Sequence, residues 1–143
     1  MQAIAITHQA HKQLLRLCSL ALPREACGVL AGTEAAEAGH ATVTDIRSIT
    51  NVHEDPLRSF RFHPGEWVSA YYDMQKNRQS LVGFFHSHPT SSALPSKRDT
   101  LGLPASDRQI SYWIISMAGS ADPFVQPYLL ENGTFRPLAL MLA

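Results

Sequence analysis

Apolar residues near the start of the chain predict a strand followed by a helix. Residues 3–6 form a short apolar run, which is typical of a buried strand. Thr7 can cap the helix that follows, because a threonine hydroxyl accepts a hydrogen bond from a free N–H group of the first turn. This helix is expected to extend to about residue 21, with small and apolar side chains recurring every three or four positions. The buried stripe so predicted consists of Ala10, Leu14, Leu17, Cys18 and Ala21.

The middle of the chain predicts two strands, a loop and a second helix. Strands are expected at residues 25–33 and 40–47, and the polar segment 48–59 predicts a loop. Pro64 suits the first turn of a helix that would end near Asn77. The side chains that this helix is expected to bury are Trp67, Val68, Tyr71 and Met74.

The other apolar runs predict short strands and one hairpin. Asn132-Gly133 separates two of these runs, and this dipeptide is a strong signal for a type I′ turn. Residues 90–107 are rich in Ser, Pro, Thr and Asp and predict a functional loop. The apolar tail 138–143 is expected either to pack as a final strand or to contact a partner, for example in a homodimer. The strands expected outside the regions described above are residues 60–62, 80–85, 110–117, 124–131 and 134–141.

These elements indicate one domain of the α/β (α+β) class over residues 1–143. A chain of 143 residues is long enough to bury a real core. Hydrophobic residues make up 45% and charged residues 17%, a balance that excludes a long disordered chain. We find no repeat and no linker that would divide the chain.

Charge, cysteine content and hydropathy exclude several other classes of protein. The chain has 12 basic and 12 acidic residues, so no overall positive field attracts nucleic acid. Two cysteines are too few for a disulfide framework. The start of the chain lacks the pattern of a signal peptide, and no apolar run reaches the roughly 18 residues of a membrane span. We therefore expect a cytoplasmic protein with no nucleic-acid partner and no membrane partner.

Three residues near the middle of the chain have the spacing of a catalytic metal site. His86 and His88 follow the strand predicted at 80–85, and side chains two apart on an extended chain point to one face. Asp99 follows across a loop long enough to fold back. Two histidines and one carboxylate would leave one tetrahedral position open for water, as in catalytic zinc sites. Alternatively, the histidines are ordinary polar residues, and Ser96 and Asp99 form a capping box for a short helix.

Two motifs together resemble the JAMM/MPN family of metalloproteases. Residues 86–99 match its pattern His-x-His-Pro, six residues, Ser, two residues, Asp. Residues 23–32 (PREACGVLAG) are similar to the P-x-E-x-C-G-x-L-x-G segment of small bacterial members. The resemblance covers about residues 2–136, in the order that the family has them. Further matching residues are Asn51, Pro56, Phe60, Phe62, Pro64 and Glu66.

The resemblance implies a fold, a cofactor and roles for five residues. The fold would be a curved mixed β-sheet flanked by helices, similar to that of cytidine deaminases. Zn²⁺ would be bound by His86, His88 and Asp99, with a water completing the tetrahedron. Glu25 would act as the general base that takes the proton of this water and passes it to the leaving amine. Ser96 would stabilise the oxyanion that forms on the carbonyl.

The resemblance also implies a substrate. Small bacterial members cleave the peptide or isopeptide bond after the Gly-Gly C-terminus of a ubiquitin-like sulfur-carrier protein. Two alternatives remain open, namely another JAMM peptidase role of the phage-tail or cell-wall type and a non-catalytic MPN-like scaffold that binds protein partners. Cys27 lies two residues from Glu25, and we favour a packing role for it over that of a nucleophile.

Overall fold

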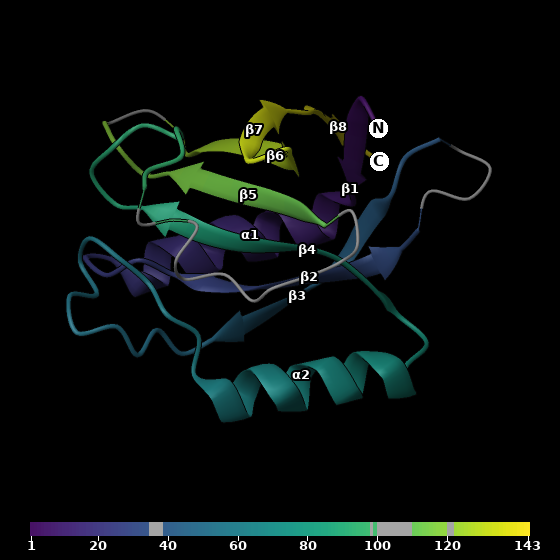
Figure 1. The fold of residues 1–143 in the computed structure, drawn as a ribbon, viewed down its shortest axis with the longest axis horizontal. Coiled ribbons are helices and arrows are strands. Elements are labelled where there is room, and N and C mark those ends of the chain that lie inside the picture. Colours follow the sequence, from purple (N-terminus) through teal and green to yellow (C-terminus); the bar gives the residue numbers. More distant parts are fainter. Residues whose placement is uncertain (35–38, 98, 100–109, 120–121) are drawn as a thin grey trace.

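One mixed sheet runs through the computed structural model, which describes residues 1–34, 39–97, 99, 110–119 and 122–143. Within these ranges the strand order is β7-β6-β5-β4-β2-β3-β1-β8. Figure 1 shows β5, β4, β2 and β3 side by side in this order. The strands are β1 (Ala3–Ile6), β2 (Cys27–Thr33), β3 (Thr42–Ile49), β4 (Ser80–His88), β5 (Ser111–Ser116), β6 (Phe124–Glu131), β7 (Thr134–Pro137) and β8 (Ala139–Leu142).

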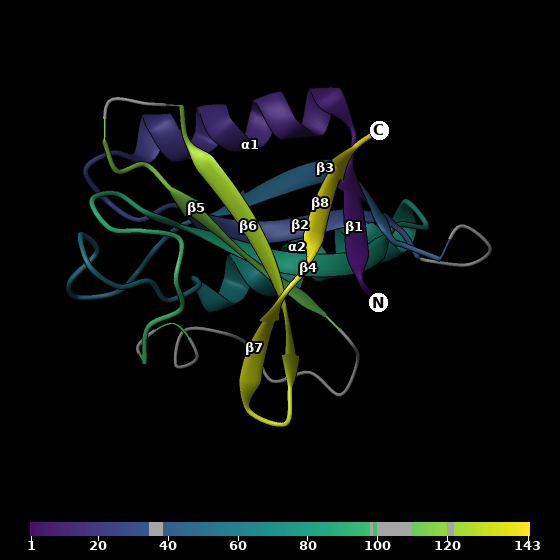
Figure 2. The ribbon, with the colours of Figure 1, turned by 90° about the horizontal axis from the view of Figure 1, so that it is seen from above.

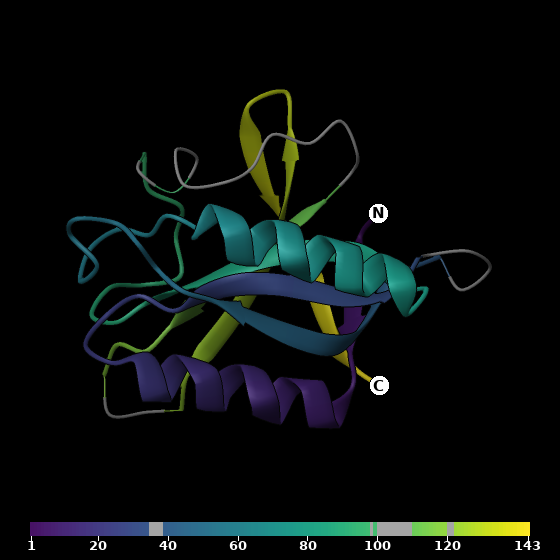
Figure 3. The same ribbon diagram turned by 90° about the horizontal axis from the view of Figure 1, so that it is seen from below.

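Two helices, α1 (His8–Ala21) and α2 (Pro64–Lys76), cover opposite faces of the sheet (Figure 3). On the α1 side, Leu14 and Cys18 pack with buried strand residues such as Leu30 and Trp113. On the α2 side, the core is largely aromatic and includes Phe84. This arrangement confirms the predicted α/β class and the mixed sheet flanked by helices. Neither helix of the described ranges is long and apolar enough to cross a membrane.

The first helix agrees with its prediction. The Thr7 hydroxyl accepts a hydrogen bond from the N–H of Ala10 at 3.2 Å and so caps α1. Ala10, Leu14 and Cys18 are buried, and Leu17 and Ala21 pack against the same core cluster. The three-and-four spacing of the stripe therefore identified the face that meets the sheet.

The second helix buries only part of the predicted set of side chains, since Tyr71 is partly exposed. Met74 is buried and Trp67 packs against the α2-side core, as expected. Val68, however, is 49% exposed. Val68 and Tyr72 are four residues apart and therefore share the outer face of α2, where Tyr72 is also exposed.

Six of the eight predicted strands are present with small shifts at some ends, the strand predicted at 60–62 is absent, and the one predicted at 134–141 is divided. The predicted strand 40–47 continues to Ile49 in β3, because Ser48 and Ile49 pair with Gly28 and Cys27 of β2. Phe62 forms only an isolated bridge with Asn51 instead of a strand.

The end of the chain forms two strands where one was predicted at 134–141. Asn132 and Gly133 both have positive φ angles, 51° and 77°, as a type I′ turn requires, and β7 pairs with β6. After Leu138 the chain leaves this hairpin and β8 pairs in parallel with β1 (Figure 2). The apolar tail is thus a final strand, as one of its two predicted arrangements required.

Candidate metal centre and active site

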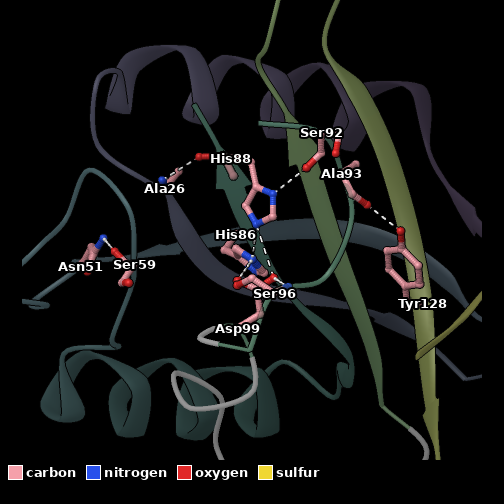
Figure 4. A network of polar contacts seen from close by, with 11 residues as sticks. Ala26, Asn51, Ser59, His86, His88, Ser92, Ala93, Ser96, Asp99 and Tyr128 are labelled. Carbon is pink, nitrogen blue, oxygen red and sulfur yellow. Dashed lines mark hydrogen bonds and ion pairs between the residues drawn. The ribbon is translucent and has the colours of Figure 1, made fainter. Parts of the chain in front are cut away.

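The two histidines of the predicted metal site lie at the carboxyl end of β4. They are two residues apart on one strand, so both imidazoles point to the same side, and both are buried. Their Nε2 atoms are 3.2 Å apart (Figure 4). The buried ring of Phe60 stacks on His86, with 4.4 Å between the ring centroids. The sheet therefore places the histidines together without help from the loop that follows.

Asp99 completes the cluster from the far end of that loop. One carboxylate oxygen lies 3.0 Å from Nε2 of His86, and the other lies 3.4 Å from Nε2 of His88. The same carboxylate accepts a hydrogen bond from the N–H of Ser96 at 2.7 Å. Asp99 thus meets the histidines and also makes one of the bonds of the predicted capping box, so these two interpretations are compatible.

The spacing of these donor atoms fits a metal ion. Zinc is bound by imidazole nitrogen and carboxylate oxygen at about 2.0–2.2 Å, so the ligand atoms of a tetrahedral site lie roughly 3.3–3.6 Å apart. Separations of 3.0, 3.2 and 3.4 Å in this cluster are close to that range. Among the described residues, these three form a buried group able to hold a metal ion.

A backbone carbonyl determines which ring nitrogen of the neutral His88 imidazole carries the proton. Its Nδ1 lies 2.7 Å from the carbonyl oxygen of Ser92. A carbonyl can only accept, so Nδ1 carries the proton and, in the neutral ring, Nε2 carries the lone pair. Metal-binding histidines commonly have such a partner on the second ring nitrogen. In the neutral ring, the lone pair of His88 therefore faces Nε2 of His86 and the Asp99 carboxylate.

Burial and hydrogen bonding shift the pKa values of His86 and Asp99. Burial lowers the pKa of His86, an effect larger than the opposing one of Asp99, so the imidazole is neutral and able to donate its lone pair. Burial alone would raise the pKa of Asp99, but the hydrogen bonds with His86 and His88 hold it well below its ordinary value. Asp99 is therefore an anion over the physiological pH range.

Glu25 is buried close to this cluster, but it does not lie in a strand. The predicted strand 25–33 begins only at Cys27, so strand alternation does not determine where the Glu25 side chain points. Burial lowers the pKa of His88, yet Asp99, the Ser92 carbonyl and the charge of Glu25 together raise it above its ordinary value. The negative charge of Glu25 therefore acts on His88, one residue of the candidate metal centre.

The other predicted site residues take different positions. Ser96 is exposed on the segment that leads to Asp99, and its carbonyl accepts a hydrogen bond from the Asp99 N–H at 3.2 Å. Cys27 is buried, and burial followed by the charges of Glu25 and Glu66 raises its pKa to about 12. A thiol that stays protonated is a poor nucleophile, which supports the packing role.

Sequence analysis assigned no role to Ser87, although it lies between the two histidines. Its hydroxyl, on the opposite side of β4, accepts a hydrogen bond from the N–H of Ala26 at 2.8 Å (Figure 4). This bond ties the residue after Glu25 to the strand that carries both histidines. The sequence did contain a signal for this role: Ser87 is a polar residue in a largely apolar strand, and strand alternation turns its side chain away from the histidines.

Comparison with protein families gives a match over residues 7–126 to the family described as prokaryotic homologs of the JAB domain. The chain belongs to this family. The match confirms the resemblance to JAMM/MPN proteins that the sequence motifs indicated. The JAB domain of this chain is also similar in structure to a Desulfitobacterium hafniense protein, with a TM-score of 0.84 and 31% identity. That similarity covers 98% of this chain and 92% of the other.

Two curated relatives carry names that describe cleavage. The JAB domain is 36% identical over 91 residues to the desampylase of Haloferax volcanii, covering 64% of this chain and 57% of that protein. It is 32% identical over 96 residues to a probable TtuB-protein conjugate cleaving protease of Thermus thermophilus, covering 67% and 60% respectively. The matched regions thus span less than two thirds of the length of each relative.

Proposed function

We propose that this JAB-domain protein is a zinc-dependent peptidase. It would hydrolyse the peptide or isopeptide bond after the Gly-Gly C-terminus of a ubiquitin-like sulfur-carrier protein. The observation that carries the proposal is the buried cluster of His86, His88 and Asp99, with the charge of Glu25 beside it. The names of the relatives, a desampylase and a conjugate-cleaving protease, support the reaction class.

His86, His88 and Asp99 would hold the zinc ion, since two imidazoles and one carboxylate leave a fourth position open. When bound, zinc lowers the pKa of a water ligand and polarises the substrate carbonyl. The hydrogen bond from His88 to Ser92 and the contact of His86 with Phe60 keep the two imidazoles oriented. The protein therefore supplies a ligand set that needs little rearrangement.

Glu25 would take the proton of the attacking water and return it to the departing amine. This second transfer is needed because an amine leaves an amide only after its nitrogen is protonated. Ser96, exposed beside Asp99, would donate its hydroxyl to the carbonyl oxygen as negative charge develops there.

A carrier with a Gly-Gly tail suits such a site for a physical reason. Two residues without side chains can enter a narrow cleft and form main-chain hydrogen bonds with an extended segment of the enzyme.

We propose that the protein acts in the cytoplasm, as one domain of residues 1–143. Its buried thiols at Cys18 and Cys27, neither of them in a disulfide, fit that reducing compartment. A homodimer remains a prediction.

Mass spectrometry of carrier–peptide fusions tests the proposal. The zinc-loaded protein should cleave after the second glycine, and a Gly→Val change at either glycine of the carrier should slow cleavage. Cleavage at other positions, or indifference to valine, would refute the carrier as substrate. Bound zinc without cleavage of any peptide would favour the scaffold interpretation.

The variant Glu25→Gln tests the proposed base in the same assay. The amide has nearly the shape of the carboxylate but cannot accept the proton, so turnover should fall about 10²- to 10⁴-fold. Zinc content and melting temperature should stay near those of the wild type. Near wild-type turnover would show that another group is the base.

A further inference from the structure

A single side chain ties the segment after β3 to the backbone of Glu25. The Asn51 Nδ2 donates to the carbonyl oxygens of Glu25, at 3.1 Å, and of Ser59, at 3.0 Å. Its Oδ1 accepts from the N–H groups of His53, at 3.0 Å, and of Arg61, at 3.1 Å. A side-chain amide has two donor hydrogens and two acceptor lone pairs, so Asn51 uses its full capacity.

These hydrogen bonds hold a part of the backbone that is not paired in the sheet. β2 begins at Cys27, so the backbone of Glu25 needs other partners. Its N–H donates to the carbonyl oxygen of Pro56 at 2.8 Å, and its carbonyl accepts from Asn51. Residues 51–61, which we call the clamp segment, therefore hold both backbone polar groups of Glu25.

The metal ligands are tied to the same place. Phe60 of the clamp segment stacks on His86. The backbone of Ala26, next to Glu25, exchanges two hydrogen bonds with Ser87: its N–H donates to the hydroxyl at 2.8 Å, and its carbonyl accepts from the N–H at 2.9 Å. In Figure 4, Asn51, Ser59 and Ala26 all lie on the same side of the two histidines. Glu25 is thus held between the clamp segment and β4.

We propose that Asn51 is a positioning residue for the general base. Its amide fixes the backbone of Glu25 at a set distance from β4 and so aims the carboxylate at the metal centre. The inference rests on the proposed function of Glu25. Misplacement of a reacting group by about 1 Å can cost about 10²-fold in rate, so losing the clamp should lower turnover more than substrate affinity.

Two variants and a matched control test this role. Asn51→Asp keeps the accepting oxygen but replaces the donating Nδ2 with a second oxygen, which would face the two carbonyl oxygens. Asn51→Ser has a side chain too short to make the same hydrogen bonds, and it adds no charge. Asn77→Ser is the control, because Asn77 also donates from Nδ2 to a carbonyl, that of Asp73 at 3.0 Å, but at the end of α2. Both Asn51 variants should lose about 10- to 100-fold in kcat with KM within about threefold, while the control and all zinc contents stay unchanged.

Hydrogen exchange gives a readout that does not depend on activity. In Asn51→Ser, peptides covering residues 22–28 and 51–61 should exchange faster than in the wild type, and peptides from β5, β6 and α1 should not. A general structural role would raise exchange throughout the protein. Unchanged exchange at residues 22–28, or failure of both Asn51 variants to fold, would overturn the assignment.

A double variant separates this inference from the proposed function. If Asn51 acts through Glu25, then Asn51→Ser should cost no further rate in a Glu25→Gln background, because residues that act as a unit are not additive. Losses that multiply would overturn the positioning role while leaving Glu25 as the base. If the wild type cleaves no carrier fusion, the proposed function fails, and the exchange measurement still decides whether Asn51 holds Glu25.

Discussion

At the scale of single residues, hydrogen bonds act on two of the three proposed metal ligands, His88 and Asp99. The Ser92 carbonyl fixes the proton of His88 on Nδ1, and the imidazoles keep Asp99 ionised. With both imidazoles neutral, as metal binding requires, the proposed ligand set would have a net charge of −1 and would match the borderline-soft character of zinc. Metal binding should therefore be sensitive to the loss of any one of the three.

Zinc content tests the ligand assignment residue by residue. The purified wild type should hold about one zinc ion per chain, whereas His88→Ala should lose most of it, because two donors hold zinc poorly. Elemental analysis after dialysis gives the stoichiometry. His63→Ala is the control, since His63 caps α2 instead of facing the centre. Equal zinc in wild type and His88→Ala would rule out His88 as a ligand.

Thiol reactivity tests the two buried cysteines. Burial raises the pKa of Cys18 and of Cys27 to about 12, so at pH 8 only about one thiol in 10⁴ is the reactive thiolate. Both should react with a thiol reagent far more slowly in the folded protein than in denaturant. Rapid reaction of one thiol in the native state, followed in single Cys→Ser variants, would contradict its assigned packing role.

At the scale of elements, the site depends on how closely β2 packs between β3 and β4. Gly28 lies next to Cys27 and pairs with Ser48 of β3 and Phe85 of β4. A Cβ atom there would lie 2.2 Å from the carbonyl oxygen of Arg47 and 2.6 Å from the Phe85 ring. The glycine therefore permits the approach that brings Glu25 to His86 and His88.

Replacing this glycine should destabilise the sheet. Gly28→Ala should lower the free energy of unfolding by about 2 kcal/mol or more, because the strands must separate to accept the methyl group. Urea denaturation measures the loss. Gly65→Ala is the control: its Cβ would meet only side-chain atoms of His63, the nearest at 3.1 Å, and should change stability by about 1 kcal/mol or less. Equal stabilities of the two variants would contradict this account.

At the scale of the molecule, the metal centre joins distant parts of the chain. β4 would supply two ligands and the segment ending at Asp99 the third, while the clamp segment holds the backbone of Glu25. A metal ion bound only by the folded protein stabilises the whole fold through mass action.

Zinc should therefore raise the melting temperature. Free zinc at about 100 times its Kd adds about 2.7 kcal/mol of stability, or roughly 8 °C for a domain of this size. Scanning calorimetry with and without a chelator measures the shift. His88→Ala should show little of it, and an equal shift in that variant would place the stabilising ion elsewhere.

Sequence analysis anticipated the elements well where local patterns decide them. The stripe of α1, the Thr7 cap and the Asn132-Gly133 turn are each set within a few residues, and each agrees with the structure. Val68 was placed wrongly because apolar character does not say which face of a helix meets the sheet. The predicted strand 134–141 divides because Leu138 marks the point where the chain changes partners, from β6 to β1.

The sequence by itself determined the ligand types and their spacing. Two histidines at an interval of two on an extended strand share a face wherever that strand lies, so their pairing needed no tertiary information. The match to a known motif added Asp99 and Glu25, which no local pattern places beside them.

Only the tertiary structure decided how these residues meet. Glu25 is held near the histidines by hydrogen bonds across the chain: Asn51 donates to the Glu25 carbonyl over 26 positions, and the next residue, Ala26, donates to the Ser87 hydroxyl over 61 positions. Such contacts depend on which strands become neighbours, since β2 pairs with β4 across the 46 residues, 34–79, that separate the two strands. Burial and the contacts between these side chains then shift their pKa values: burial lowers the pKa of His86, whereas hydrogen bonds with both histidines lower that of Asp99 against the effect of burial.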